Sequence, residues 1–317
     1  MQKVDVWPLL TPESRAVSQK SRELYAGVRD LPDHPVAAAR AAYLVERRFW
    51  NGFPAPVASV EDFPAETEHG RAMLRLYHPR PGERLPLVLF LHGGGFILGN
   101  LDTHDRVQRL LALESGWAVL GVDYALAPEA KFPTQILQIV DVLEQLPALL
   151  ADRDVDGGRL VFAGDSAGAN LAMGTAYELR TRGRALPQGL LLYYGGFGLK
   201  DGTSRRLYGG ELDGLGERER EMYFTAYRRS EADMVDPRYD ILRGELAGLP
   251  PTHLVAVRLD PLCDDSVALA EGLKVVGVPV TLSIYDGVLH GFLHYTAMEP
   301  KALQAIREGA AFLERLG

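Results

Sequence analysis

Length, composition and charge already limit what this chain can be. Its 317 residues are 47% hydrophobic and 24% charged, the composition of an ordinary globular protein with a substantial core. A formal net charge of −8 at pH 7 argues against nucleic acid or an anionic lipid surface as a partner. One cysteine excludes an internal disulfide, and neither a secretory signal nor an apolar run of about 18 residues is visible. We therefore expect a cytoplasmic protein without nucleic-acid or membrane partners.

Helix-start signals mark the first fifty residues, and strands follow. Thr11-Pro12-Glu13 combines a capping residue with a proline in the first turn, and Asp33–Pro35 begins a second helix that Gly52 closes. Short apolar runs then predict strands. These strands lie near 56–61, 70–77, 86–91, 117–123, 159–164, 189–194, 252–259 and 279–285.

The spacing of these strands predicts an α/β fold. The first three leave no room for helices between them and are expected to form antiparallel pairs. The later strands alternate with helical patterns, which is typical of a parallel sheet. We expect one domain over residues 1–317, with an eight-stranded, mostly parallel sheet flanked by helices. The strand near 279–285 could pair with a second copy, so homo-oligomerisation stays open. The helical patterns cover 133–150, 167–182, 264–276 and 299–316.

A glycine loop follows the third strand. His92-Gly93-Gly94-Gly95 presents backbone N–H groups without side chains in the way. Such donors, aimed at one point, stabilise the oxyanion of a tetrahedral acyl-transfer intermediate. A flexible loop or a phosphate-binding turn is the alternative, but neither G-x-G-x-x-G nor a trailing Lys-Ser/Thr follows. We expect His92 to hold this loop by hydrogen bonds.

A second motif, Gly164-Asp165-Ser166-Ala167-Gly168, stands between a strand-like run and a helix-like run. A G-x-S-x-G in that context is the nucleophile elbow of α/β-hydrolases, which exposes the serine hydroxyl on a strained turn. A Cβ at either glycine would collide with neighbouring backbone. The alternative is a serine in an ordinary glycine-rich turn, which the context and the glycine loop disfavour. Ser166 is therefore the predicted nucleophile, and Ala167 supplies a predicted oxyanion donor.

The histidine of the triad must follow Ser166 and the acid in the chain. His253 begins a strand and is expected to lie in a wall. His290 lies in a loop after the last strand, where a carboxyl end meets the active-site edge. His294 lies about one helical turn further and is interpreted as packing. His290 is therefore the predicted base.

The acid is predicted at the end of the seventh strand. Asp260 closes the run 254–259, and Pro261 stops the strand there. A carboxylate at that point can accept a hydrogen bond from the histidine Nδ1–H and fix its tautomer. Asp264 and Asp265 stand at the start of the next helix and are expected to cap it. Asp260 is therefore the predicted acid.

Two segments lie outside the sheet pattern, at about 1–50 and about 198–247. The second contains a charged helical run over 215–227 and falls between the sixth and seventh strands. An insertion there lies above the carboxyl ends of the strands, hence over Ser166. We predict that both segments form a helical cap that excludes water. The alternative is surface decoration.

The residues that follow the glycine loop and the sixth strand are candidates for the substrate pocket. We expect one or more of their rings to close the acyl side and limit it to two to four carbons. The alternative is that the tyrosines pack under the cap. The candidates are Phe96, Leu98, Tyr193 and Tyr194.

With these motifs in hand, the chain resembles the hormone-sensitive-lipase-like group of α/β-hydrolases, and within it bacterial acetyl esterases. The likeness covers almost the whole chain and is weakest over the first forty residues. It implies short-chain ester hydrolysis without a cofactor. It also implies Ser166, Asp260 and His290 as the triad and Gly93, Gly94 and Ala167 as oxyanion donors. The likeness rests on His92–Gly95, Asp123-Tyr124 with Ala127-Pro128-Glu129, Gly164–Gly168, Asp260–Leu262 with Asp264, and His290–Phe292.

The function predicted from the sequence is a serine carboxylesterase that acts on a small-molecule ester, with no metal and no cofactor. An amidase or formamidase with the same triad is an open alternative, because the tetrahedral intermediate is shared. A non-catalytic receptor on this fold is a third reading, which would predict loss of a triad residue. All three candidate residues are present.

Overall fold

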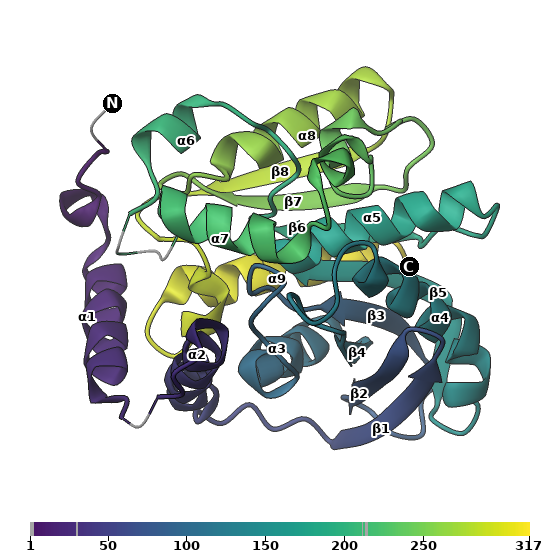
Figure 1. Ribbon diagram of the computed structural model, residues 1–317. Helices are drawn as coiled ribbons and strands as arrows, with labels where there is room; N and C mark the ends of the chain where they lie inside the picture. Colours follow the sequence, from purple (N-terminus) through teal and green to yellow (C-terminus); the bar gives the residue numbers. More distant parts are fainter. Residues whose placement is uncertain (1–2, 30, 211, 213–214) are drawn as a thin grey trace.

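An eight-stranded sheet forms the centre of the molecule (Figure 1). The computed structural model describes residues 3–317 except 30, 211 and 213–214. Each predicted strand is present in the structure, with ends shifted by a few residues. The α/β prediction is therefore confirmed. The strands are β1 (Ser59–Thr67), β2 (Gly70–His78), β3 (Leu85–Leu91), β4 (Ala118–Asp123), β5 (Val155–Asp165), β6 (Gly189–Tyr193), β7 (Thr252–Val257) and β8 (Val280–Tyr285).

The strand order is β1-β2-β4-β3-β5-β6-β7-β8, and it corrects one expectation. β1 and β2 pair antiparallel as predicted, but β3 pairs parallel with β4 and β5. β2 instead pairs antiparallel with β4. The reason is a helix that the sequence reading missed, α3 (Asp105–Ser115), which connects β3 to β4. This crossover returns the chain to the sheet between β2 and β3.

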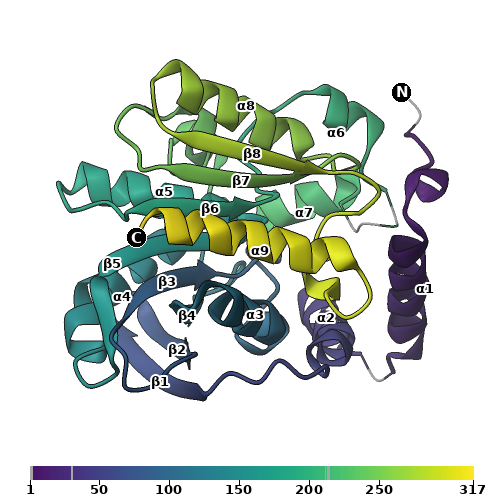
Figure 2. The same ribbon diagram turned by 180° about the vertical axis from the view of Figure 1, so that it is seen from behind.

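Helices cover both faces of the sheet (Figures 1 and 2). α3 and α9 (Pro300–Arg315) pack together on one face, and α4 (Thr134–Leu149), α5 (Ala167–Thr181) and α8 (Cys263–Val275) cover the other. The central strand β3 is accordingly apolar throughout, and every one of its residues is buried. Among the described helices, none combines the length and the apolar character that crossing a membrane requires.

The remaining helices gather at one end of the sheet, where the parallel strands have their carboxyl ends (Figures 1 and 2). Thr11 caps the first of them, because its side chain accepts from the N–H of Ser14. These helices belong to the two predicted cap segments, of which positions 1–2, 30, 211 and 213–214 lie outside the described residues. They are α1 (Pro12–Gly27), α2 (Pro35–Asn51), α6 (Thr203–Leu207) and α7 (Glu217–Tyr227). The short 3₁₀ turns are η1 (Trp7–Leu9), η2 (Asp102–His104), η3 (Glu231–Val235), η4 (Ile241–Arg243) and η5 (Phe292–Tyr295).

His253 lies in β7, away from this end, and gives a testable pH dependence. Its Nδ1 is 2.7 Å from Thr281 Oγ1, and burial lowers the pKa of its imidazole from 6.5 to about 4. Between these values the unfolded chain binds a proton that the folded chain does not. The part of the free energy of unfolding that depends on a neutral His253 is therefore fully present above pH 6.5 and is lost as the pH falls toward 4.

We expect the free energy of unfolding of His253→Gln to rise by about 2 kcal/mol relative to wild type when the pH is lowered from 7 to 5. A glutamine at this position would keep a hydrogen-bonding group near Thr281 but cannot titrate. Urea unfolding at the two pH values measures this difference. A difference between variant and wild type that stays constant with pH would contradict the assignment.

Candidate active site

The turn between β5 and α5 has the strained geometry of a nucleophile elbow. Ser166 has φ 54° and ψ −117°, a conformation that is unusual for a residue other than glycine. A Cβ on Gly164 would lie 2.5 Å from the carbonyl carbon of Gly168. A Cβ on Gly168 would lie 1.9 Å from the carbonyl oxygen of Leu91. Glycine is therefore required at both positions, as the motif predicted.

Three side chains from three separate loops form one hydrogen-bonded chain. His290 Nε2 lies 2.8 Å from Ser166 Oγ, and His290 Nδ1 lies 2.6 Å from Asp260 Oδ2. Asp260 is fully buried, and its other oxygen accepts the N–H of Leu262 at 2.8 Å. The carboxylate is therefore fixed in place and oriented toward Nδ1. The sequence had predicted these three residues together.

The two other acids after β7 bind loops instead of capping α8. Asp265 Oδ1 accepts the N–H groups of Phe197, Gly198 and Leu199 at 2.8, 3.0 and 3.0 Å. Asp264 Oδ2 accepts the N–H of Ser204 at 2.9 Å. The N-cap of α8 makes no side-chain hydrogen bond. The capping prediction was therefore wrong, since both carboxylates hold the chain that leaves β6.

The glycine loop is held from two sides. His92 Nδ1–H donates to the carbonyl of Gly93 at 2.9 Å, and Tyr124 donates its hydroxyl to the carbonyl of His92 at 2.6 Å. The two rings stack with centroids 4.2 Å apart. Burial lowers the pKa of His92 to about 3, so this imidazole is neutral near pH 7 and too weakly basic to serve as the general base. His92 thus has the holding role that was expected.

One predicted oxyanion donor is wrong. The N–H of Gly93 donates to Asp165 Oδ1 at 2.8 Å, so it does not face the serine. Gly94 and Gly95 line the hollow beside Ser166, whereas Gly93 does not. Within the described part of the chain, the backbone N–H groups of Gly94 and Gly95 donate no hydrogen bond. Gly95 therefore replaces Gly93 as a candidate donor, beside Gly94 and Ala167.

Asp165 is the centre of a buried polar cluster behind the serine. His104 Nε2 lies 3.2 Å from Oδ1, and the Tyr194 hydroxyl donates to Oδ2 at 3.4 Å. Burial alone would raise the pKa of the Asp165 carboxyl, but His104 and the N–H of Gly93 outweigh it and hold the pKa below its ordinary value. Asp165 is therefore an ionised anchor that joins the elbow to the glycine loop. Sequence reasoning had not assigned it a role.

The same cluster has atoms at distances that could hold a metal ion. One ligand atom each from His104, Asp165 and His294 lies within 4.8 Å of the others, and all three residues are buried. The pKa of His294 is lowered well below 6.5 by burial, so its ring is neutral. Both oxygens of the Asp165 carboxylate already accept hydrogen bonds, one from the N–H of Gly93 and one from the hydroxyl of Tyr194. We interpret the cluster as structural.

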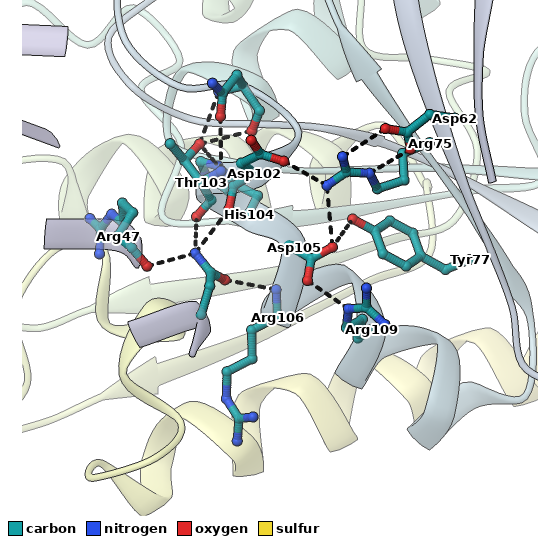
Figure 3. A network of polar contacts seen from close by, with 12 residues as sticks. Arg47, Asp62, Arg75, Tyr77, Asp102, Thr103, His104, Asp105, Arg106 and Arg109 are labelled. Carbon is teal, nitrogen blue, oxygen red and sulfur yellow. Dashed lines mark hydrogen bonds and ion pairs between the residues drawn. The ribbon is translucent and has the colours of Figure 1, made fainter. Parts of the chain in front are cut away.

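A polar network fixes the segment that carries His104 (Figure 3). Thr103 Oγ1 lies 2.8 Å from His104 Nδ1. The side chain of Asn51, at the end of α2, donates to the carbonyls of Asp102 and Thr103 at 3.0 and 3.1 Å. Arg75 of β2 binds Asp102 at 2.9 Å from the other side. The position of Asp165 therefore depends on contacts that reach both α2 and the sheet.

Two hollows meet at Ser166. The larger, about 300 Å³, contains His290 and Gly291 and is walled by α1 and α2. The smaller, about 50 Å³, is mostly apolar and is walled by α7. A hollow of about 590 Å³ at the other end, near α4 and β5, contains none of the predicted site residues. The smaller hollow is lined by Gly95, Phe96, Ser166, Ala167, Gly196, Leu215, Arg220, Tyr223, Phe224 and Leu262.

The pocket prediction is half correct. Phe96 lines the smaller hollow and Leu98 the larger. Tyr193 lines neither, because its hydroxyl points to α9 and would lie 2.3 Å from a Cβ on Gly309. Tyr194 packs its ring against His290 at 4.8 Å and lies behind the site. The sequence missed the lining residues of α7 and α2, whose orientation depends on how the helices dock.

Comparison with known proteins agrees with this geometry. The model of the alpha/beta hydrolase fold family matches residues 88–294, and the chain belongs to this family. It is similar to a hyperthermophilic esterase from the archaeon Pyrobaculum calidifontis at 32% identity, over 97% of this chain and 99% of that one, with a TM-score of 0.88. A thermostable esterase from Pseudomonas putida matches at 25% identity over 97% and 98%, with a TM-score of 0.88. A thermophilic carboxylesterase cloned from a metagenomic library matches at 28% identity over 89% and 98%, with a TM-score of 0.85.

These matches confirm the predicted class, a serine hydrolase of carboxylic esters in the hormone-sensitive-lipase-like group. The family match spans the glycine loop and all three triad candidates, from His92 to His290.

Proposed function

We propose that the chain hydrolyses short-chain acyl esters through an acyl-enzyme in which Ser166 is the nucleophile. The hydrogen-bonded chain from Ser166 through His290 to Asp260 carries this proposal. His290 Nε2 takes the serine proton as Oγ attacks the ester carbonyl, and the same nitrogen then protonates the leaving alcohol. Asp260 fixes the tautomer and stabilises the imidazolium. Water activated by His290 then releases the acid.

Backbone N–H groups hold the oxyanion in both halves of the reaction. Gly94 and Gly95 are beside the serine, and Ala167 is the first residue of α5, where an N–H has no partner within the helix. Donors of this kind are typically worth about 10²–10³-fold each in kcat. α1, α2 and α7 act as a cap that keeps water from the site, since their side chains line both hollows.

The two hollows take the two halves of the ester. His290 must reach the leaving oxygen, so the alcohol occupies the larger hollow, which His290 and Gly291 line. The acyl group then occupies the smaller hollow, where Ala167 and Phe96 form the wall. Its volume of about 50 Å³ supports an acyl group of two to four carbons.

The profile of kcat/KM against acyl length tests this proposal. We expect a maximum between acetyl and butyryl and a steep fall by eight carbons. Each methylene that fits adds up to about 0.8 kcal/mol, and a clash with the wall reverses the trend. Hydrolysis of esters of one alcohol with acyl chains of increasing length measures the profile. A flat or rising profile would contradict the assignment of the smaller hollow.

Two variants of α7 sharpen this experiment. Phe224→Ala enlarges the smaller hollow and should move the maximum to longer acyl chains. Met222, on the same helix, is 40% exposed and lines neither hollow, so Met222→Ala should leave the profile unchanged. Equal shifts in both variants would indicate a general effect of α7 and would count against Phe224 as the acyl wall.

A further inference from the structure

The larger hollow contains a buried arginine whose hydrogen-bonding groups are not fully used. Arg47 of α2 is 6% exposed, and its Nε and Nη1 have no hydrogen-bond partner within the described part of the chain. Its Nη2 lies 3.9 Å from where a Cβ on Gly291 would stand, directly after the catalytic histidine. Buried donors of this strength are normally satisfied by protein, water or ligand.

The nearest acid, Glu46, forms a buried ion pair with this guanidinium. Glu46 Oε2 lies 3.4 Å from Arg47 Nη1 without hydrogen-bond geometry. Its other oxygen already accepts from Trp50 Nε1 at 2.6 Å and from Ser21 Oγ at 2.9 Å. Glu46 does not line the hollow, so a ligand there meets the cation and not its counter-ion.

Two tyrosine rings hold the guanidinium at the wall. Tyr43 and Tyr295 lie with ring centroids 4.6 and 5.5 Å from the guanidinium carbon. Burial raises the pKa of both hydroxyls although a hydrogen bond with Arg47 opposes the shift, so both hydroxyls are neutral near pH 7. The rings fix the plane of Arg47 without removing its positive charge.

The rest of this wall also favours an anion. Arg22 adds a second cation and Tyr25 a hydroxyl, whereas the hydroxyl of Ser18 already donates to the carbonyl of Ser14. Asp165 is the single acid among the described lining residues, and the N–H of Gly93 and His104 already bind its carboxylate. The charged side chains that the structure describes on this side of the site are therefore two arginines and one carboxylate that is already bound.

We propose that Arg47 is an anion subsite for the alcohol part of the substrate, which makes the preferred substrates short-chain acyl esters of hydroxy acids. This inference rests on the proposed function, because it assigns the leaving alcohol to the larger hollow. Arg47 and Ser166 line the same hollow, so the substrate in this proposal carries its carboxylate a few bonds from the ester oxygen and has its carbonyl carbon at Ser166. A site built to bind a charged group discriminates strongly against an analogue that lacks it.

Two esters of equal size test the inference. 3-Acetoxypropanoate carries a carboxylate on the alcohol part, and 3-acetoxypropanamide replaces it with a neutral amide. We expect wild-type kcat/KM to be about tenfold or more higher for the carboxylate, mainly through KM. Ethyl hemisuccinate and ethyl succinamate place the same two groups on the acyl part, in the smaller and mostly apolar hollow that Arg47 does not line, and should show a smaller preference.

Variants then assign the preference to Arg47. The double variant Glu46→Gln/Arg47→Met removes both charges, so no carboxylate is left buried alone. In this variant the kcat/KM values for the two acetyl esters should be about equal, so that their ratio is about one. Glu46→Gln should keep the ratio. Arg48 is the next residue of α2, is exposed and does not line this hollow, so Arg48→Met should change neither ratio nor rate.

The wild-type ratio decides the question even where a variant does not fold. The subsite is overturned if both acetyl esters are hydrolysed but the wild-type ratio of their kcat/KM values is one or less. It is also overturned if the ratio is unchanged in the double variant, or if the carboxylate on the acyl part gives the larger gain. If neither acetyl ester is hydrolysed, the proposed function is overturned, and the subsite with it.

Discussion

Ser166→Ala is expected to lower kcat for an acetyl ester by on the order of 10³-fold or more, with a melting temperature close to that of the wild type. Ser166 Oγ is the atom that forms the acyl-enzyme, and members of a triad act as a unit, so removing one removes most of the benefit of the others. Alanine keeps a Cβ in the same strained turn. The stability of the elbow should therefore not change.

Steady-state kinetics and thermal unfolding on the same samples measure this. Ser115→Ala is the matched control, because Ser115 ends α3 away from the site, where its hydroxyl donates to the carbonyl of Leu111 at 2.6 Å and accepts the N–H of Trp117 at 3.1 Å. It should retain wild-type kcat. Near-normal turnover by Ser166→Ala would exclude the serine mechanism, and a large fall in melting temperature would mean that the loss of rate reflects unfolding.

The triad candidates could be predicted from the sequence because each is marked by its local context. Ser166 stands in a strand-turn-helix motif, and Asp260 and His290 lie three and five residues after the ends of β7 and β8. Carboxyl ends of neighbouring parallel strands meet at one edge, so residues at those ends converge without any knowledge of packing. The strand pattern was readable for the same reason, since β3, β6 and β7 are buried on both faces and therefore apolar.

Features that depend on orientation could not be predicted in the same way. Gly93 is excluded as an oxyanion donor because Asp165 binds its N–H, which leaves Gly95 as the candidate. The sequence does not show in which direction a backbone N–H points. Tyr193 and Tyr194 are adjacent and point to different neighbours, α9 and His290. Period-two alternation could have excluded one of them. Whether α2 lines the pocket depends on how this helix packs, and its last residue, Asn51, binds the carbonyl of Asp102 in η2. The sequence pattern does not predict that contact.

The missed helix shows a different limit. α3 carries buried residues such as Val107 and Leu111 at helical spacing, but its start overlaps the polar segment around Asp102. Without α3, the second and third strands were expected to pair antiparallel, whereas β2 pairs with β4. Its hydrophobic periodicity was the available signal.

Asp260→Asn is expected to lower kcat by about 10²–10⁴-fold while leaving the fold intact. Asp260 Oδ2 lies 2.6 Å from His290 Nδ1, and Oδ1 accepts the N–H of Leu262. An asparagine can keep the bond to Leu262 only by turning its NH₂ toward His290. That NH₂ would favour the tautomer with the proton on Nε2, which cannot accept the proton of Ser166. The loss should therefore appear in kcat more than in KM.

Asp264→Asn is the matched control, since the two acids are close in the chain and differ in what they bind. Asp264 Oδ2 accepts the N–H of Ser204, and an asparagine oxygen can accept the same bond. We expect Asp264→Asn to keep kcat within about threefold and to cost on the order of 0.5–1.5 kcal/mol in the free energy of unfolding. Kinetics and urea unfolding of both variants separate the two effects. If Asp264→Asn lost the rate and Asp260→Asn kept it, the acid of the triad would be Asp264, and the hydrogen bond between Asp260 and His290 would be structural only.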